Sequence, residues 1–403
     1  MGEDQITVVK INQDYCSRCL ICYALCPYEA IEKDAETDKV EIDIQKCQVC
    51  GLCYSACPVF AIEIAYYTYD DLVKYVREKM QQTKADTLVC MCRGNSPSTG
   101  EIDEILENQG LKVENYIPLR LPCSGRMPAE FIFNVLGLGI KKIVSIQCED
   151  EFCRYKEGTK ANTRRLLLSK KVLEDLGYPS DALTVVKYSR KAIYFTEKCV
   201  GCDKCVFICP YSAIEAEDLA TPKVLDEYCM GCGACALVCP HHAIQLKGFE
   251  FEEVLKRYMD AAAKYKARGK SPLILAFCCQ WSEFKALDEP EKLISKNILP
   301  MEIPCFNALD PVHIVNALQN GFDGVIGIVC SDDDCKLQEG RHTSRLNMEV
   351  LNLFLDRLGL SGRFELFEAS PRFISNVEKK LDEFIEKIAS MKTAKTLQVK
   401  KEV

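Results

Sequence analysis

Short apolar runs alternate with amphipathic stretches in two long segments of the chain, one from 87 to 188 and one from 273 to 388. Runs this short, bounded by turn residues and separated by residues at helical spacing, predict buried strands alternating with helices. Such alternation is typical of a parallel α/β layer. The expected strands are Thr87–Cys92, Tyr116–Pro122, Lys142–Cys148 and Leu183–Tyr188 in the first segment, and Leu273–Cys279, Met301–Pro304, Gly324–Cys330 and Arg363–Ala369 in the second.

Helices are expected between these strands. In the first segment, the pattern predicts helices over 128–138 and 158–176. In the second, Asp310-Pro311 provides an N-cap and a first-turn proline for one helix. A last helix, from Ser370-Pro371 through Ile388, has no counterpart in the first segment.

The two remaining segments, 1–66 and 191–248, contain only short apolar runs among many cysteines. In the first of them we expect a strand over Ile6–Ile11 and a hairpin around Glu32–Glu41. The linkers that follow these segments place apolar residues at helical spacing and predict packing helices over 69–84 and from Phe251 to Ala262.

The cysteine positions repeat along the chain. Thirteen of the 26 cysteines lie up to Cys153, and thirteen lie from Cys199 onward. Nearly all equivalent positions, such as Cys123 and Cys305, are 182 or 183 residues apart. The chain is therefore one unit written twice, in the order A-B-A′-B′. The expected domains are 1–66 (A), 67–190 (B), 191–248 (A′) and 249–391 (B′), with a tail at 392–403.

Composition narrows the function classes. A net charge of −8 argues against a nucleic-acid partner, which would favour clustered Lys and Arg. No apolar run approaches the roughly 18 residues of a membrane span. The chain starts with acidic residues and not with a signal peptide, so 26 cysteines indicate metal binding in a reducing, oxygen-poor compartment more than a disulfide scaffold. We expect a cytoplasmic protein without a transmembrane segment.

Segments A and A′ each carry two runs of the form C-x2-C-x2-C-x3-C-P. In such a pair, the first three thiolates of a run bind one iron–sulfur cluster and the fourth binds the other. Four zinc sites are the alternative, but zinc has no use for the third C-x2 step or the trailing proline. The expected cofactor-binding sets are Cys16, Cys19, Cys22 with Cys57; Cys47, Cys50, Cys53 with Cys26; Cys199, Cys202, Cys205 with Cys239; and Cys229, Cys232, Cys235 with Cys209.

Four glycines within these runs are expected to let the backbone approach the cluster sulfides, where amide hydrogen bonds tune the potential. They are Gly51, Gly201, Gly231 and Gly233. With all sixteen motif cysteines present, A and A′ resemble the bacterial-type ferredoxins that hold two [4Fe–4S] clusters.

Segments B and B′ each carry five further cysteines. They are Cys90, Cys92, Cys123, Cys148 and Cys153 in B, and Cys278, Cys279, Cys305, Cys330 and Cys335 in B′. Three of these groups follow predicted strands, at the sheet edge where α/β folds place their sites. The spacing favours a [2Fe–2S] cluster and leaves a zinc site or a redox disulfide as alternatives.

B and B′ resemble the delta subunit of methyl-viologen-reducing hydrogenase, an iron–sulfur protein that docks hydrogenase or formate dehydrogenase onto heterodisulfide reductase. The resemblance rests on Phe277-Cys-Cys-Gln-Trp281, Pro122-Cys-Ser-Gly-Arg126, Cys148-Glu-Asp-Glu-Phe-Cys153, Cys330-Ser-Asp-Asp-Asp-Cys335, Glu157-Gly158 with Arg164, and Glu339-Gly340 with Arg345.

That family carries one [2Fe–2S] cluster, so the resemblance implies two sets of metal ligands. They are Cys92, Cys123, Cys148, Cys153 in B and Cys279, Cys305, Cys330, Cys335 in B′. Neighbours on a strand face opposite ways, so Cys278 and Cys279 are not expected to bind one cluster together. B′ departs from the motif after Cys305, where Phe-Asn-Ala replaces Ser-Gly-Arg. B departs from it in having Cys90-Met-Cys92 in place of adjacent cysteines. These departures leave two alternatives for one half, the loss of its cluster or the gain of a different docking face.

The expected fold is multidomain, α+β and α/β, with two ferredoxin-like 2[4Fe–4S] domains alternating with two parallel-sheet α/β domains. No G-x-G-x-x-G after a strand, phosphate-binding loop or nucleophile elbow is present, so no catalytic residue is assigned. The sequence predicts an electron-transfer subunit with four [4Fe–4S] and one or two [2Fe–2S] clusters.

The resemblance implies two kinds of partner: hydrogenase or formate dehydrogenase, and a heterodisulfide-reductase-like flavoprotein. One alternative is an enzyme that reduces a disulfide or transfers sulfur through Cys90 or Cys278. Another is a scaffold or redox sensor.

Overall fold

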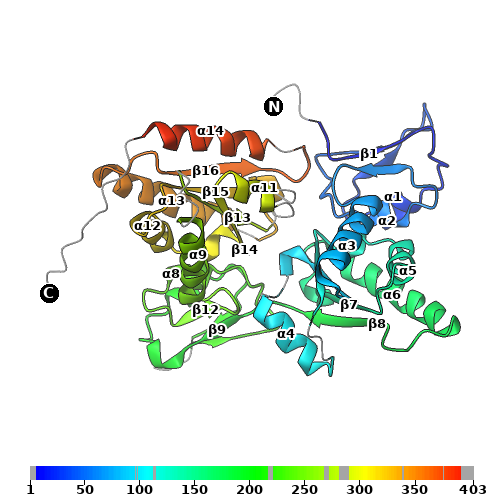
Figure 1. The fold of residues 1–403 in the computed structure, drawn as a ribbon, viewed down its shortest axis with the longest axis horizontal. Helices are drawn as coiled ribbons and strands as arrows, with labels where there is room; N and C mark the ends of the chain where they lie inside the picture. Colours follow the sequence, from blue (N-terminus) through cyan, green and yellow to red (C-terminus); the bar gives the residue numbers. More distant parts are fainter. Residues whose placement is uncertain are drawn as a thin grey trace. The chain divides into compact units, whose positions relative to one another are not determined.

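The structure is a computed structural model of the 403-residue chain and describes residues 6–95, 97, 99–111, 115–216, 221–266, 272–280, 290–337, 340–374 and 376–391. The chain divides into two compact units (Figure 1). Unit 1 is Met1–Ser189 with Pro371–Ile374, and unit 2 is Arg190–Ser370 with Ser375–Val403. The division between the units at 189 and 190 falls where the repeat begins again.

The first part of unit 1 is built from very short elements. Its strands pair as two antiparallel ladders, and the predicted hairpin is confirmed. The strand expected over Ile6–Ile11 is shorter than predicted. The elements are β1 (Val9–Ile11) with β4 (Ile62–Ile64), β2 (Ile31–Lys33) with β3 (Val40–Ile42), and helices α1 (Ile21–Leu25) and α2 (Leu52–Ala56).

The second part of unit 1 is a four-stranded parallel sheet in the order β6-β5-β7-β8. Its strands are β5 (Thr87–Cys92), β6 (Ile117–Leu121), β7 (Lys142–Cys148) and β8 (Leu183–Tyr188). Its helices are α3 (Tyr69–Thr83), α4 (Thr99–Asn108), α5 (Ala129–Gly137) and α6 (Gly158–Asp175), with the 3₁₀ turns η1 (Arg93–Asn95), η2 (Ser124–Arg126) and η3 (Asp150–Phe152).

The predicted strands and helices of this part are confirmed, apart from one or two residues at their ends. The central strands β5 and β7 are rich in aliphatic residues because helices cover both faces of a parallel sheet. The chain order reverses between β5 and β7, and in open α/β sheets sites lie outside the carboxyl ends of strands at such a point. The helix α3 begins with a capping box between Thr68 and Asp71, which the sequence analysis missed.

Unit 2 repeats this plan. Its first part pairs β9 (Ala192–Tyr194) with β12 (Ile244–Leu246) and β10 (Ile214–Glu215) with β11 (Lys223–Val224), with η4 (Thr196–Lys198), α7 (Lys204–Ile208) and α8 (Ala234–Val238). The linker helix is α9 (Phe251–Lys266). The parallel sheet β14-β13-β15-β16 follows. It contains β13 (Ile274–Cys279), α11 (Pro290–Ser295), β14 (Ile298–Ile303), η5 (Phe306–Ala308), α12 (Pro311–Gln319), β15 (Gly324–Cys330), η6 (Asp332–Asp334), α13 (Gly340–Arg357), β16 (Phe364–Ala369) and α14 (Val377–Ser390).

Two predictions for this sheet need correction. The strand expected over Met301–Pro304 begins earlier, at Ile298, because it pairs with β13 from its first residue. The last helix begins at Val377 and not at Ser370-Pro371. Pro371–Ile374 instead belong to unit 1 and form a turn followed by an isolated bridge between Thr7 and Phe373, and the Val8 N–H donates to the Arg372 carbonyl at 2.8 Å.

Corresponding faces of the two sheets are covered by different helices. In unit 1, Val89 and Met91 pack against Ile102 of α4. In unit 2, strand pairing places Ala276 and Cys278 at the same positions, but they pack in one cluster with Leu381 and Phe384 of α14. The local helix α4 and the distant helix α14 therefore perform the same packing task.

Candidate metal centres

Each of the four predicted ferredoxin-type ligand sets lines one cavity. We call the cavities lined by Cys16 and Cys199 the outer cavities, and those lined by Cys50 and Cys232 the inner cavities. In every set three cysteines come from one run and the fourth from the other, as the spacing predicts. The binding of clusters by these residues stays a prediction.

The short helices α1, α2, α7 and α8 produce this exchange of ligands. The third cysteine of each run lies within the helix, and the fourth lies at its C-cap in an extended conformation, which turns it toward the other cavity. Each C-cap sulfur accepts a hydrogen bond from the backbone N–H four residues on. The N–Sγ distances are 3.4 Å at Cys26, 3.3 Å at Cys57, 3.3 Å at Cys209 and 3.2 Å at Cys239.

The inner and outer cavities differ in burial. Cys19 and Cys202 of the outer sets are exposed, whereas Cys50 and Cys232 of the inner sets are buried. Burial raises the pKa of Cys50 to about 12. Holding such groups as thiolates requires strong compensating positive charge, which bound iron would supply. The preference for iron–sulfur clusters over zinc continues to rest on the cysteine spacing.

The four glycines of the runs have positive φ, and the space beside each of them differs. A Cβ at Gly233 would lie 2.5 Å from Ala308 Cβ, and one at Gly51 would lie 2.5 Å from Arg126 Nε. A Cβ at Gly201 would meet nothing within 4 Å. Gly51 and Gly233 therefore allow the turn after Cys123 or Cys305 to pack closely against the inner run.

The four cysteines predicted for B lie together at the carboxyl ends of the strands. Cys92 ends β5 and Cys148 ends β7, while Cys123 and Cys153 lie in the loops that follow β6 and β7. Hydrogen bonds from the Cys123 and Cys148 thiols hold the pKa of Cys92 well below its usual value. We call this group the B site.

The corresponding cysteines of B′ also converge. The hydrogen bond with Cys279 raises the pKa of Cys330, and burial together with Cys330 and Cys335 raises that of Cys305. We call Cys279, Cys305, Cys330 and Cys335 the B′ site. Strand pairing shows that the two sites are equivalent. Cys92 pairs with Leu121, two residues before Cys123. In the same way, Cys279 pairs with Ile303, two residues before Cys305.

The fifth cysteine of each half lies apart. Cys90 is fully buried, and burial alone raises its pKa to about 12. Cys278 packs in an apolar cluster with α14, and its Sγ lies 3.7 Å from the Ala276 carbonyl oxygen. Cys90 and Cys278 are not equivalent in the strand register, since Cys90 corresponds to Phe277. The geometry therefore agrees with the choice of four from five in both halves.

We expect Cys90→Ala to leave the iron content of anaerobically purified protein unchanged, because Cys90 belongs to no group of converging thiols. Cys92→Ala should remove about two iron atoms per chain, the content of one [2Fe–2S] cluster. Iron analysis of the two variants side by side tests this. Loss of iron in Cys90→Ala with full retention in Cys92→Ala would show that the ligand set is wrong.

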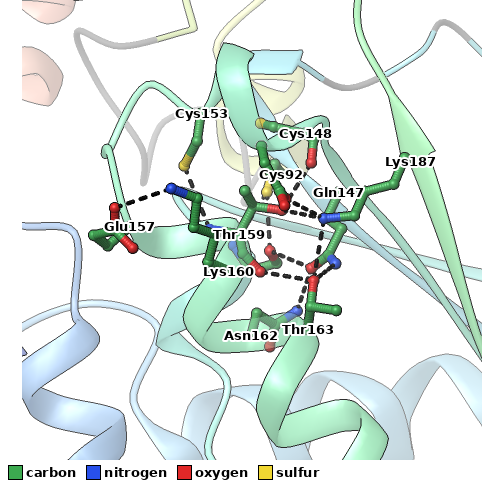
Figure 2. Close-up of polar contacts among 12 residues, drawn as sticks. Cys92, Gln147, Cys148, Cys153, Glu157, Thr159, Lys160, Asn162, Thr163 and Lys187 are labelled. Atoms are coloured by element: carbon green, nitrogen blue, oxygen red, sulfur yellow. Dashed lines mark hydrogen bonds and ion pairs between the residues drawn. The ribbon is translucent and has the colours of Figure 1, made fainter.

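A polar network surrounds the B site (Figure 2). The Gln147 amide accepts a hydrogen bond from Asn162 at 2.8 Å and donates to Thr163, and Lys187 Nζ donates to Thr163 at 3.1 Å. Ser124 Oγ lies 3.4 Å from Gln147 Oε1 and 3.1 Å from Cys92 Sγ. The sequence analysis did not identify this network, because its members are spread over three strands, a turn and a helix.

Two arginines, the buried Arg126 and the half-buried Arg165, join the inner run of unit 1 to the turn that follows Cys123. Arg126, 1% exposed, donates to the backbone carbonyls of Val49 and Tyr66, and Arg165 donates to the Gly125 carbonyl and the Ser55 hydroxyl. The sequence analysis quoted Arg126 only as part of a motif. The sequence holds no local signal that Arg126 packs against Gly51, because the two residues lie 75 positions apart in the chain.

The inner cavity and the B-type site are neighbours in each unit. The pKa of Cys123 is raised by its hydrogen bond with Cys92, by burial, and by the nearby sulfurs of Cys92, Cys153 and Cys50. Cys50 belongs to the inner set, so it lies close to the B site. In unit 2, Cys232 and Cys305 belong to one packed cluster. The outer and inner sets also adjoin each other, since Cys22 and Cys57 of one set and Cys47 and Cys53 of the other pack against the same apolar cluster. Trp281, Glu339 and the predicted tail 392–403 lie outside the described residues.

Comparisons with known proteins agree with these kinds of site. A family model for the delta subunit of methyl-viologen-reducing hydrogenase matches residues 88–198 and 274–392. Models of 4Fe–4S dicluster domains match residues 8–58 and 192–246. Both predicted resemblances, the fold class and the presence of [4Fe–4S] domains are thereby confirmed.

Relatives of two kinds are found. One is from the ferredoxin/F420H2-dependent CoB-CoM heterodisulfide reductase of Methanosarcina acetivorans, a subunit 33% identical over 167 residues, which is 41% of this chain and 21% of that protein. The other is an iron–sulfur subunit of the F420-non-reducing hydrogenase of Archaeoglobus profundus, 32% identical over 92 residues, 22% of this chain and 67% of that protein. The chain thus spans about a fifth of the reductase relative. No helix in the described part of the chain is long and apolar enough to cross a membrane.

Proposed function

Because the chain belongs to the family of the delta subunit of methyl-viologen-reducing hydrogenase, we propose that it is an electron-transfer subunit of a multi-subunit redox complex. It passes single electrons between an oxidoreductase of the hydrogenase or formate dehydrogenase type and a flavin-containing, heterodisulfide-reductase-like partner. It makes and breaks no substrate bond itself.

The observation that carries this proposal is the succession of three thiol sites in each unit. An outer cavity adjoins an inner cavity, and the inner cavity adjoins a B-type site. Electron tunnelling weakens steeply with distance, so neighbouring redox sites are what a conducting protein requires. A storage or sensing protein would need only one such site.

Four [4Fe–4S] clusters and one or two [2Fe–2S] clusters would supply the one-electron chemistry. The protein's part is to hold them, with the sixteen ferredoxin-type cysteines around the four cavities and the two B-type sets at the ends of the strands. Backbone N–H groups that donate to cysteine sulfurs tune the potential. The hydroxyl of Tyr194, 2.9 Å from Cys205 Sγ, adds a side-chain contact of this kind.

The disulfide-reducing alternative finds no support in the positions of its two candidate nucleophiles. Cys90 and Cys278 are each 0% exposed, and a thiol with a raised pKa is a poor nucleophile. Neither can reach an external disulfide without opening the sheet.

Anaerobic purification with iron and acid-labile sulfide analysis tests the proposal. We expect about twenty iron atoms per chain if both B-type sites hold a [2Fe–2S] cluster and about eighteen if one does. Identification of co-purifying proteins tests the partners. An iron content near four, or zinc in place of iron, would refute the proposal, and so would a fully loaded chain that exchanges no electrons with hydrogenase-type or flavin-containing partners.

A further inference from the structure

We propose that the hydroxyl of Ser124 raises the reduction potential of the B site above that of the B′ site, so that the two halves of the chain are electronically different. This inference rests on the proposed function, because it takes both sites to hold iron–sulfur clusters. Its basis is a comparison of equivalent residues around the two sites.

Ser124 is placed to act on the sulfur of Cys92. The residue is 0% exposed, its backbone N lies 3.2 Å from Cys92 Sγ and its Oγ lies 3.1 Å from the same sulfur. A sulfur bound to iron has no proton, so the hydroxyl is the group that must donate. Hydrogen bonds to a cluster thiolate stabilise the more negative, reduced state and therefore raise the potential.

The surrounding network holds this hydroxyl in place. Gln147 Oε1 lies 3.4 Å from Ser124 Oγ and accepts from Asn162 Nδ2, which fixes the amide. The amide nitrogen donates to Thr163 Oγ1. The Ser124 hydroxyl has a single proton, and the negatively charged thiolate at 3.1 Å is a nearer and stronger acceptor than the Gln147 oxygen at 3.4 Å.

The B′ site has apolar residues at the corresponding positions. Phe306, 2% exposed, replaces Ser124, and Val329 replaces Gln147. A phenyl ring offers no O–H or N–H donor to a sulfur. The larger side chain of Phe306 fits because the residue beside it is smaller: Gly327 stands where unit 1 has Ser145. A Cβ at Gly327 would overlap the Phe306 ring. The backbone contact is kept in both halves, as Gly125 N to Cys123 Sγ at 3.3 Å and Asn307 N to Cys305 Sγ at 3.5 Å.

Charge differs in the same direction. Arg126 is buried in the turn after Cys123, donates to backbone carbonyls of the inner run, and has Ala308 as its counterpart in unit 2. Unit 2 has a different buried arginine, Arg190, which donates to Gln280 next to Cys279. Strand pairing with Gln147 and Val329 makes Lys187, which forms an ion pair with Asp150 at 2.6 Å, equivalent to Glu368. The buried Asp334 lies near Cys330 in unit 2. An anion disfavours the reduced, more negative cluster, so Asp334 also lowers the potential of the B′ site relative to the B site.

The test is a redox titration of the full-length, anaerobically purified protein, followed by electron paramagnetic resonance at a temperature where only [2Fe–2S] signals persist. The wild type should show two [2Fe–2S] midpoints. Ser124→Ala should shift the higher one to a lower potential and leave the lower one in place. Ser145→Ala is the matched control, since this buried hydroxyl has no hydrogen-bond partner among the described residues and should move neither midpoint.

The reciprocal variant is Phe306→Ser combined with Gly327→Ser, which transfers the unit 1 pair of residues to unit 2. It should shift the lower midpoint to a higher potential. If this variant does not fold, the Ser124→Ala and Ser145→Ala pair still decides the question.

Two other results would have distinct meanings. Equal midpoints, or a Ser124→Ala titration that matches the wild type, would overturn the inference while the electron-transfer proposal stands. Complete absence of [2Fe–2S] signals from a protein whose [4Fe–4S] signals are intact would overturn the assignment of the B and B′ sites in the proposed function and the inference with it.

Discussion

Removal of iron by anaerobic chelation should unfold the ferredoxin-like parts of both units while the two parallel sheets stay folded. The buried apolar core of the first ferredoxin-like part includes Val9, Ile62 and Ile64, and cysteines make up much of what packs around them. Small domains with cores of this size rarely gain more than about 3–5 kcal/mol from them and depend on metal binding for stability. The sheet of unit 2, in contrast, lies between two large apolar clusters.

Hydrogen exchange measured by mass spectrometry, before and after chelation, provides the readout. Amides of β1 and β4 should lose protection almost completely, because their free energy of local opening falls toward zero. Amides of β13 and β15 should keep most of theirs and serve as the internal control. Retained protection in β1 and β4, or equal loss in all four strands, would contradict the expectation.

Gly233→Ala should destabilise unit 2 and reduce the iron content of the B′ site. Gly233 has φ +89°, and its added Cβ would meet the Ala308 Cβ at 2.5 Å and the Ala308 Cα at 2.7 Å. The left-handed conformation costs about 1–2 kcal/mol for an L-residue, and overpacking a tight contact adds roughly 1–3 kcal/mol. Ala308 closes the turn that follows Cys305, so the collision should displace this ligand.

Gly201→Ala is the matched control for this substitution. Gly201 also has positive φ, at +67°, but an added Cβ would meet nothing within 4 Å. Anaerobic denaturation should therefore show a larger loss of stability for Gly233→Ala, and metal analysis should show iron loss in that variant alone. Equal losses in both variants would mean that backbone strain, and not the contact with Ala308, limits the site.

The architecture could be predicted from the sequence because two strong patterns coincide. The cysteine spacing from Cys16 to Cys57, repeated from Cys199 to Cys239, predicts that each cavity is lined by three cysteines of one run and one of the other. The runs Thr87–Cys92 and Gly324–Cys330 are buried on both faces, so their apolar character is continuous and their limits are clear. Cysteine spacing and continuous apolar runs can both be read directly from a single sequence.

What escaped prediction depends on contacts between residues far apart in the chain. Ser370-Pro371 has the start signals of a helix, yet the residues that follow form a turn and a bridge to Thr7, where backbone hydrogen bonds with Ile6 and Val8 satisfy them. The roles of Ser124 and Arg126 depend on Gln147 and Gly51, which come from other elements. The exclusion of Cys278 depends on its packing with α14, and only the folded chain brings the two together.

The different covers of the two sheets have a consequence for how the protein is made on the ribosome. In unit 1, α4 lies between β5 and β6 in the chain, so its face of the sheet can be closed soon after these segments emerge. In unit 2, Leu293 of α11 reaches this face early, but the four α14 residues that cover most of it, Val377, Leu381, Phe384 and Ile388, come about a hundred residues after β13. During synthesis, the second sheet therefore exposes apolar surface for longer than the first. Chaperones that act on nascent chains should bind this half of the protein preferentially.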